Sequence, residues 1–103
     1  MIVTTKNEIS GKQCEELGLV QGNIVYCANI GRDLMASFKN IKGGEIKSYT
    51  KMTSDARQTA EERVIEAATA MGADAIVAAR FSCDTVAQGT IEMLCYGTAV
   101  KFV

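Results

Sequence analysis

Residues 48–81 read SYTKMTSDARQTAEERVIEAATAMGADAIVAARF, and this stretch decides the fold. Apolar side chains recur in it every three or four residues, which places them on one face of a long amphipathic helix. That face consists of Tyr49, Met52, Ala56, Ala60, Val64, Ala67 and Met71. Gly72 is expected to end the helix, because glycine adopts the left-handed C′ conformation without a Cβ clash. The residues from Asp74 to Phe81 then predict a strand that is buried on both sides.

The overall composition limits the classes of function. A chain of 103 residues with 48% hydrophobic and 22% charged residues is typical of a single soluble globular domain, here residues 1–103. The formal charge of −1 argues against a nucleic-acid partner or an anionic membrane surface, since both require a basic patch. No apolar run approaches the roughly 20 residues of a membrane span, and the N-terminus does not read as a secretory signal. The expected location is the cytoplasm.

The segment before the long helix begins with strands. Residues 12–20 and 24–28 both have strand-like composition, and Gln21-Gly22-Asn23 between them is typical of a hairpin turn. Gly18 predicts a bulge or bend within the first of these strands. The simplest connection of the two strands is therefore a hairpin.

A short helix and a second hairpin complete the expected fold. Leu34, Phe38 and Ile41 are spaced as on one face of a short helix, which the double glycine Gly43-Gly44 would end. Residues 86–90 read as a hairpin loop that leads into a last strand at 91–103. We therefore expect an α+β fold: a small antiparallel or mixed sheet of three to five strands, packed against one long helix and one short helix.

The predicted strands do not alternate between apolar and polar residues, and this pattern favours an oligomer. Residues 24–28, 75–81 and 91–103 carry apolar side chains on both faces of the sheet. The two helices can cover one face, and no further element remains in the chain for the other. We therefore predict a homo-oligomer in which subunits bury the second face or its edges. The alternative is a monomer whose helices wrap both faces.

The cysteines are the first candidates for chemistry. Cys14, Cys27, Cys83 and Cys95 each lie in or beside an apolar stretch, which favours reduced, partly buried thiols over a disulfide framework. The chain contains no histidine, which is the commonest general base and the commonest metal ligand.

Cys83 and Cys95 come together if the last two strands form a hairpin. They would then lie opposite each other, or one diagonal step apart, on the same face of the sheet. Two thiolates at that distance could bind a soft ion such as Zn²⁺, Cu(I) or a metalloid. Since there is no Cys-x-x-Cys motif, the alternative is that both are small core hydrophobes. Cys14 and Cys27 could face each other in the same way across the first hairpin.

A second candidate, for a ligand or a subunit interface, is the polar group Asn29, Arg32 and Asp33, at the expected start of the short helix. A helix N-terminus favours anions, and Arg32 could hold a carboxylate or phosphate in a bidentate pair. The alternative is a helix cap with a structural Arg–Asp contact, which could cross a subunit boundary.

The sequence contains no catalytic motif. The carboxylates Asp74, Asp84 and Glu92 lie near strand ends, but no spacing fixes two of them at a catalytic separation. We therefore expect a non-catalytic, cytoplasmic, homo-oligomeric binding or scaffold protein with a small ligand or metal ion. The alternative is an enzyme whose active site forms between subunits.

Several short motifs, taken together and in order, resemble the YbjQ-like family. They are GNIVYCANIGRD at residues 22–33, the double glycine at 43–44, GADAIV at 72–77 and GTAV at 97–100. The resemblance spans nearly the whole chain. It implies a dodecin-like α+β subunit, a ring-shaped homopentamer and a catalogue label of heavy-metal binding, with a biochemical role that is largely unassigned.

The chain departs from the family pattern after the double glycine. Relatives usually continue there with arginine and then a Tyr-Glu pair, whereas this chain has Glu45 and then Tyr49-Thr50. This difference puts in doubt any charged contact that serves ligand binding at that place in relatives.

Overall fold

The long helix α2 spans Lys47–Ala70, close to its predicted bounds. The structure is a computed structural model that describes residues 1–27 and 46–103. The helix buries Met52, Ala56, Ala60, Val64 and Ala68. These residues follow one another at steps of four, so the buried ridge runs at an angle to the helix axis. For this reason Ala68 takes the core position predicted for Ala67, and Met71 is 42% exposed.

The two ends of α2 are built differently. At the C-terminus the Gly72 and Ala73 amides donate to the carbonyl oxygens of Thr69 and Ala68, both at 3.0 Å. With a φ of +81° at Gly72, these two bonds form a Schellman motif, which confirms the predicted stop. At the N-terminus the helix begins after Ile46, and no side-chain hydrogen bond caps it.

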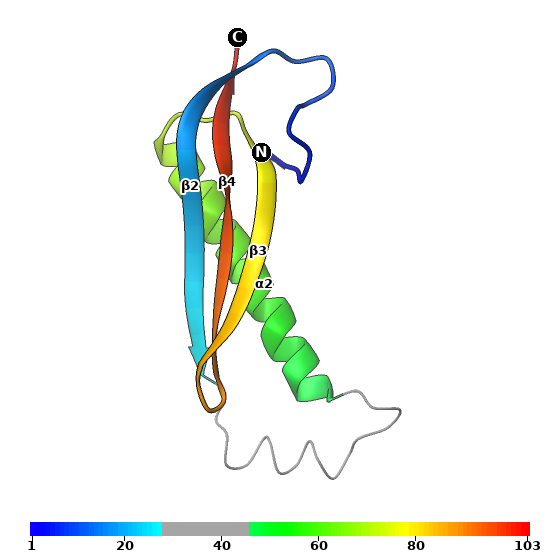
Figure 1. The fold of residues 1–103 in the computed structure, drawn as a ribbon, viewed down its shortest axis with the longest axis vertical. Coiled ribbons are helices and arrows are strands. Elements are labelled where there is room, and N and C mark those ends of the chain that lie inside the picture. The colour runs from blue at the N-terminus through cyan, green and yellow to red at the C-terminus, as the bar shows by residue number, and fades with distance from the viewer. Residues whose placement is uncertain (28–45) are drawn as a thin grey trace.

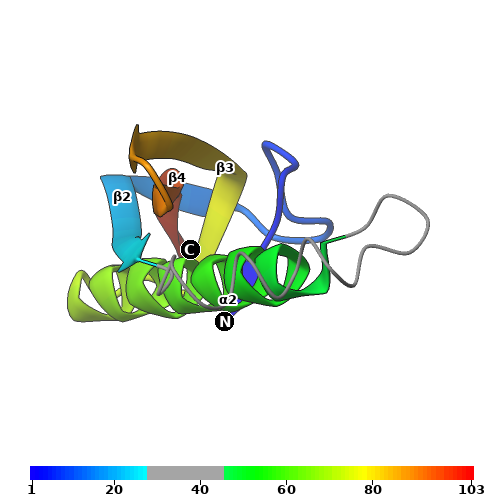
Figure 2. The ribbon, with the colours of Figure 1, turned by 90° about the horizontal axis from the view of Figure 1, so that it is seen from below.

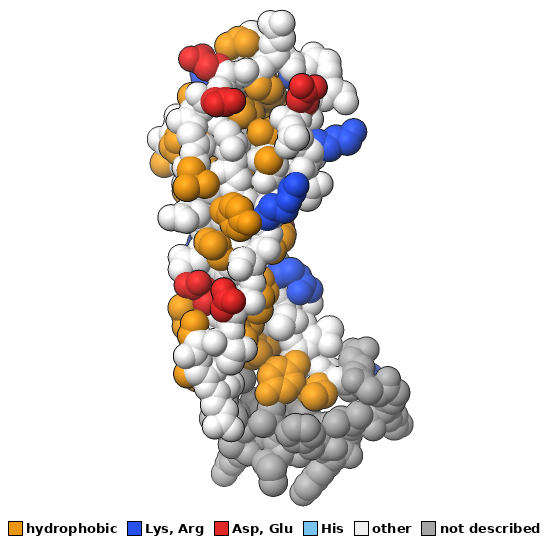
Figure 3. Space-filling model, in the orientation of Figure 1, with side chains coloured by type: hydrophobic (Ala, Val, Ile, Leu, Met, Phe, Trp, Pro, Cys, Tyr) orange, Lys and Arg blue, Asp and Glu red, His pale blue; other side chains and the backbone are white. Residues whose placement is uncertain are grey.

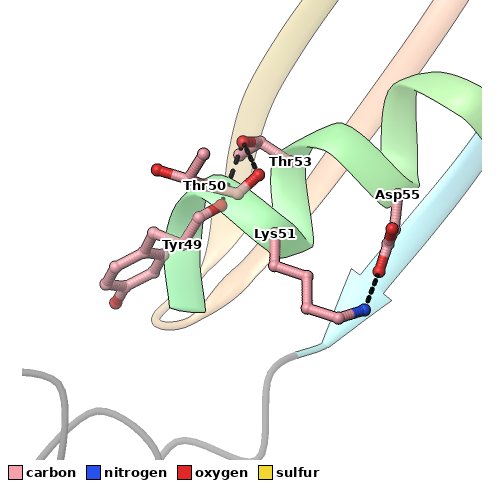
Figure 4. A network of polar contacts seen from close by, with 5 residues as sticks. All are labelled: Tyr49, Thr50, Lys51, Thr53 and Asp55. Atoms are coloured by element: carbon pink, nitrogen blue, oxygen red, sulfur yellow. Dashed lines mark hydrogen bonds and ion pairs between the residues drawn. The ribbon is translucent and has the colours of Figure 1, made fainter. Parts of the chain in front are cut away.

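Local polar contacts support the first turns of α2 (Figure 4). The Thr53 hydroxyl donates to the carbonyl oxygens of Tyr49 at 2.9 Å and Thr50 at 3.1 Å. Lys51 Nζ donates to Asp55 Oδ2 at 2.8 Å, and this hydrogen bond together with the Asp55 charge raises the pKa of Lys51. Exposed i,i+4 pairs of this kind make small contributions to helix stability.

Four strands form one mixed sheet in the order β1-β3-β4-β2 (Figure 1). The bounds are Ile2–Val3 for β1, Cys14–Cys27 for β2, Ala75–Ala87 for β3 and Thr90–Phe102 for β4. β1 pairs with β3 in parallel, and the other two pairings are antiparallel. The α+β fold with one long helix is thus confirmed, whereas the predicted short helix lies outside the described residues.

The hairpin predicted around residues 21–23 is wrong, because β2 is one continuous strand of 14 residues. Gly22 pairs with Cys95 in the middle of this strand. A Cβ at Gly22 would lie 2.3 Å from the backbone nitrogen of Val64 and 2.6 Å from the carbonyl carbon of Arg63. Glycine is therefore required here by the close approach of α2, not by a turn. The bulge expected at Gly18 is confirmed by a register shift and a φ of +134°.

A second bulge lies in β3, between Val77 and Arg80. Ala78 has a φ of +52°, which is uncommon for a residue with a side chain. Gly97 lies across from it, and a Cβ there would come within 2.8 Å of Ile76 Cγ2. At this bulge the amides of Ala78 and Ala79 turn outward from the sheet. They donate to the carbonyl oxygens of Lys6 at 2.7 Å and Thr4 at 2.9 Å.

The main core lies between α2 and one face of the sheet (Figure 2). It contains Val20, Ala56, Ala60, Val64, Ala68, Ile76, Ala79, Met93, Cys95 and Ala99. A smaller cluster lies at one end of the opposite face, where Ile9 of the N-terminal segment packs against Val77 and Val100. The strands are therefore apolar on both sides at this end of the sheet.

The rest of the face opposite α2 is mixed in character. Leu19 is 71% exposed and Val25 57% exposed, and the exposed polar residues Gln21 and Asn23 lie between them on this face of β2. Figure 3, which views this side, shows apolar side chains scattered among polar ones. The prediction that this face is continuously apolar is therefore only partly met.

Candidate functional site

Cys83 and Cys95 lie on neighbouring strands, as the hairpin prediction requires. In the β3–β4 register Cys83 is paired with Met93, and Cys95 with Phe81. The two cysteines are therefore diagonal neighbours that share one face of the sheet. Diagonal positions on an antiparallel pair are about 7–8 Å apart, within reach of long side chains.

The two thiols differ in their surroundings. Cys95 is fully buried in the core beneath α2, whereas Cys83 is exposed. Burial, and to a smaller extent the charge of Glu61, raises the pKa of the Cys95 thiol. Cys95 is therefore held in its neutral form, while metal binding requires a thiolate.

The fit of a soft ion to this pair is incomplete. Two sulfurs bound to one zinc ion at about 2.3 Å each must approach within about 4.6 Å of each other, so both side chains would have to lean together. A structural zinc site also needs four ligands. Within the part of the chain that the structure describes, no group of three or more His, Cys, Asp and Glu side chains is placed to hold a metal ion.

Cys14 and Cys27 do not face each other. They lie at opposite ends of β2, which at roughly 3.3 Å per residue spans about 43 Å. The prediction of a facing pair fails because it depended on the hairpin that Gly22 was thought to form. The Thr90 hydroxyl lies 3.5 Å from the sulfur of Cys27 and donates to it. The group Asn29, Arg32 and Asp33 lies outside the described residues.

The carboxylates have mostly structural contacts. Asp74 Oδ2 accepts a hydrogen bond of 2.8 Å from the Phe102 amide and lies 4.0 Å from Lys101 Nζ. Asp84 and Glu92 are directly opposite each other in the β3–β4 register. Glu92 also accepts a hydrogen bond of 3.3 Å from the Asn23 amide group.

The structure brings together one group of residues that the sequence did not suggest. Residues 4–13, which we name the N-terminal segment, run beside β3 in both ribbon views (Figures 1 and 2). Residues 5–13 and Arg80 line a pocket of about 820 Å³. An adjoining pocket of about 770 Å³ lies between this segment and the sheet. In the sequence, residues 6–11 show only a polar turn. Nothing there indicates a pocket, because Arg80 is distant from these residues in the chain.

Arg80 joins the N-terminal segment to the sheet. Its Nη1 atom donates to the carbonyl oxygen of Thr5 at 3.0 Å and to that of Ala79 at 2.9 Å. The bulge at Ala78 precedes Arg80 directly, and bulges commonly redirect the side chains that follow them. The Arg80 side chain therefore connects the lining of the pocket to β3. No helix within residues 1–27 and 46–103 is long and apolar enough to cross a membrane.

Comparison with known proteins identifies relatives of similar length. A UPF0145 protein of Thermosipho melanesiensis is 49% identical over 104 residues, covering 100% of this chain and 96% of the relative. A UPF0145 protein of Thermosipho africanus is 52% identical over 102 residues, covering 98% of this chain and 94% of the relative. A UPF0145 protein of Vibrio parahaemolyticus is 50% identical over 104 residues, covering 100% of this chain and 99% of the relative.

A solved structure supports the fold. A crystal structure from Pediococcus pentosaceus, described as a protein of unknown function of the DUF74 family, superimposes with a TM-score of 0.69. The alignment covers 100% of this chain and 98% of that one, at 12% identity. The family model described as "Putative heavy-metal-binding" matches residues 1–103. The chain therefore belongs to the YbjQ-like family of UPF0145 proteins.

Proposed function

We propose that this protein is a non-catalytic, cytoplasmic binding module that assembles into a homo-oligomeric ring. The ring would contain five subunits, as the family resemblance implies. Its ligand would be a small molecule or a soft metal ion, in keeping with the description of the matching family. The observation that carries the proposal is the combination of exposed apolar side chains with strand edges that pair with no other described strand.

The sheet has two long edges that face outward. β2 is the terminal strand of the sheet, and its 14 residues pair on one side only among the described strands. β1 covers β3 only at Ala75 and Ile76, so that the edge from Arg80 to Ala87 pairs with no other described strand. Long open edges favour pairing with another chain. Because the two edges differ, joining one to the other is a head-to-tail contact, which generates a ring when the rotation closes.

Exposed apolar side chains supply a reason for the subunits to associate. Leu19 and Val25 of β2 and Tyr96 of β4 lie on the face opposite α2, and they are 71%, 57% and 36% exposed. Burying a side chain such as leucine or valine fully is worth about 1.5–3 kcal/mol. Their burial in an interface would therefore add a favourable contribution to the pairing of the strand edges.

Sedimentation velocity tests the assembly. At micromolar concentration the wild-type chain should sediment as one oligomeric species. The double variant Leu19→Lys, Val25→Lys should shift toward the monomer, because it places charges in the proposed interface. The matched control is Gln58→Lys on the exposed side of α2, which should leave the oligomer unchanged. A monomeric wild-type protein, or equal dissociation of the control, would contradict the proposal.

If the ligand is a soft metal ion, its proposed ligands are Cys83 and Cys95. The position of the two residues on one face of adjacent strands supports this assignment. Elemental analysis of the purified protein, after exposure to Zn²⁺ or Cu(I), measures metal per chain. The variants Cys83→Ser and Cys95→Ser should each lose bound metal relative to the wild type. Metal bound equally well by the double variant would remove these two residues as ligands.

A further inference from the structure

The pocket beside β3 concentrates positive charge. Of the residues that line it, Lys6, Lys12 and Arg80 are cationic, and Glu8 is the one carboxylate among them. The whole chain has a formal charge of −1, so this positive group is a local feature. Figure 3 shows separate Lys and Arg side chains spaced along the side where β3 lies, with Asp and Glu side chains near its upper end.

The three cations form no ion pair with the residues that the structure describes. Within residues 1–27 and 46–103, the ion pairs join Lys51 to Asp55 and Lys101 to Asp74. Three cations around one hollow repel one another, and an anion placed between them relieves this repulsion. The lining of this pocket therefore offers three cationic groups to a negatively charged ligand.

Two of the cations are held in place before any ligand binds. Arg80 is fixed through one nitrogen, Nη1, by the carbonyl oxygens of Thr5 and Ala79. The remaining guanidinium N–H groups can still donate, and their planar fork matches phosphate oxygens. Lys12 Nζ lies 5.2 Å from the centre of the Phe102 ring, within range of a cation–π contact. Such preorganisation lowers the entropic cost of binding.

The adjoining pocket extends the site toward apolar surface. The two pockets share Asn7, Glu8, Ile9, Lys12 and Gln13 as common walls. The second pocket has Val77, Val100 and Val103 on the sheet side, together with the polar residues Thr98 and Glu16. A ligand with a charged end and an apolar body could therefore place its charge near Arg80 and its body over these valines. The volume of each pocket falls within the range of about 300–1,000 Å³ that is usual for small-molecule sites.

We infer that the N-terminal segment and Arg80 form a binding site for a small phosphate monoester. The phosphate group would be held by Arg80, Lys6 and Lys12, and the organic body would rest on the apolar side of the second pocket. This site does not depend on the proposed ring or on the thiols. Its failure in a binding assay would leave the assembly proposal intact.

Calorimetric titration with phenyl phosphate, inorganic phosphate and phenol tests the site. Phenyl phosphate should bind with the highest affinity, inorganic phosphate more weakly, and phenol not measurably. The affinity for phenyl phosphate should fall as the salt concentration rises, because the contact is ionic. Absence of phenyl phosphate binding would overturn the proposal. Equal affinity for phenyl phosphate and inorganic phosphate would overturn the role of the second pocket.

Variants locate the binding within the molecule. Arg80→Gln and Lys6→Gln should each weaken phenyl phosphate binding at least tenfold, while Arg57→Gln, an exposed cation on α2, should leave it unchanged. If Arg80→Gln fails to fold, the Lys6→Gln variant still tests the site. Among the hydrogen bonds of the described residues, Lys6 takes part through its backbone and not through its side chain. Equal loss in Arg57→Gln, or full binding in Lys6→Gln, would contradict the assignment.

Discussion

Gly22 of β2 lies directly against the backbone of Val64 in α2. A Cβ at Gly22 would be 2.3 Å from the Val64 nitrogen and 2.8 Å from the Ala60 carbonyl oxygen. The helix can lie this close to the sheet because Ala56 and Ala60, both fully buried, present small side chains at the contact. Gly22, Ala56 and Ala60 thus allow the short distance between α2 and the sheet.

The substitution Gly22→Ala should therefore destabilise the fold. Overpacking of a tight contact usually costs about 1–3 kcal/mol, and the neighbours here are backbone atoms that cannot rotate away. Urea denaturation measures the change in the free energy of unfolding. The adjacent exposed residue supplies a control, since Gln21→Ala should change stability by less than about 0.5 kcal/mol. A stable Gly22→Ala protein would show that α2 does not approach β2 this closely.

Gly72 is expected to behave differently from Gly22. A Cβ at Gly72 would meet nothing within 4 Å, so the cost of Gly72→Ala comes only from its φ of +81°. That cost is about 1 kcal/mol, and Gly72→Asn should lose less because asparagine tolerates the left-handed region. Thermal denaturation of both variants measures the difference. Equal stability of Gly72→Ala and the wild type would argue against the Schellman motif.

The buried thiol of Cys95 should make stability depend on pH at alkaline values. Its pKa is raised above the ordinary value of 9.0 in the folded state, because burial disfavours the thiolate. As the pH rises through 9.0 the unfolded chain releases this proton before the folded chain does, so stability falls. Below that pH the thiol is neutral in both states and contributes no pH dependence.

Urea denaturation at several pH values between 8 and 11 tests this dependence. Relative to the wild type, Cys95→Ala should lose stability less steeply as the pH rises through this range. Identical slopes for the wild type and Cys95→Ala would mean that the Cys95 thiol is not shielded from water.

Chemical modification gives a further prediction about the two candidate ligands. Iodoacetamide reacts with thiolates, so the exposed Cys83 should be alkylated rapidly in the folded protein. Cys95 should react slowly until the chain is unfolded. Peptide mass spectrometry after timed quenching identifies which residue is modified. Rapid alkylation of Cys95 in the native state would contradict its placement beneath α2.

The elements that could be predicted from the sequence are those set by local patterns. The spacing of Met52, Ala56, Ala60 and Val64 predicts α2, and Gly72 predicts its end, because both depend on neighbours within one or two turns. The proximity of Cys83 and Cys95 could likewise be predicted, since a short hairpin loop fixes the register of the strands that it joins.

The sequence predictions failed where a residue's role depends on distant parts of the chain. Glycine is compatible with a turn and with a close approach, and nothing near Gly22 shows that Val64 will lie against it. The pocket was missed for the same reason, since Lys6 and Lys12 meet Arg80 only after β3 forms beside the N-terminal segment. The apolar strand pattern predicts an oligomer, but the contacts between subunits depend on a second chain, so the pattern does not define the interface.

Native mass spectrometry of the purified protein tests the proposed assembly most directly. The open edges of β2 and β3 and the exposed Leu19 and Val25 predict an oligomer. The family resemblance implies five subunits, which corresponds to a single species of about 55 kDa, five times the 11.0 kDa of one chain. A spectrum that shows only the 11.0 kDa chain at micromolar concentration would contradict the assembly.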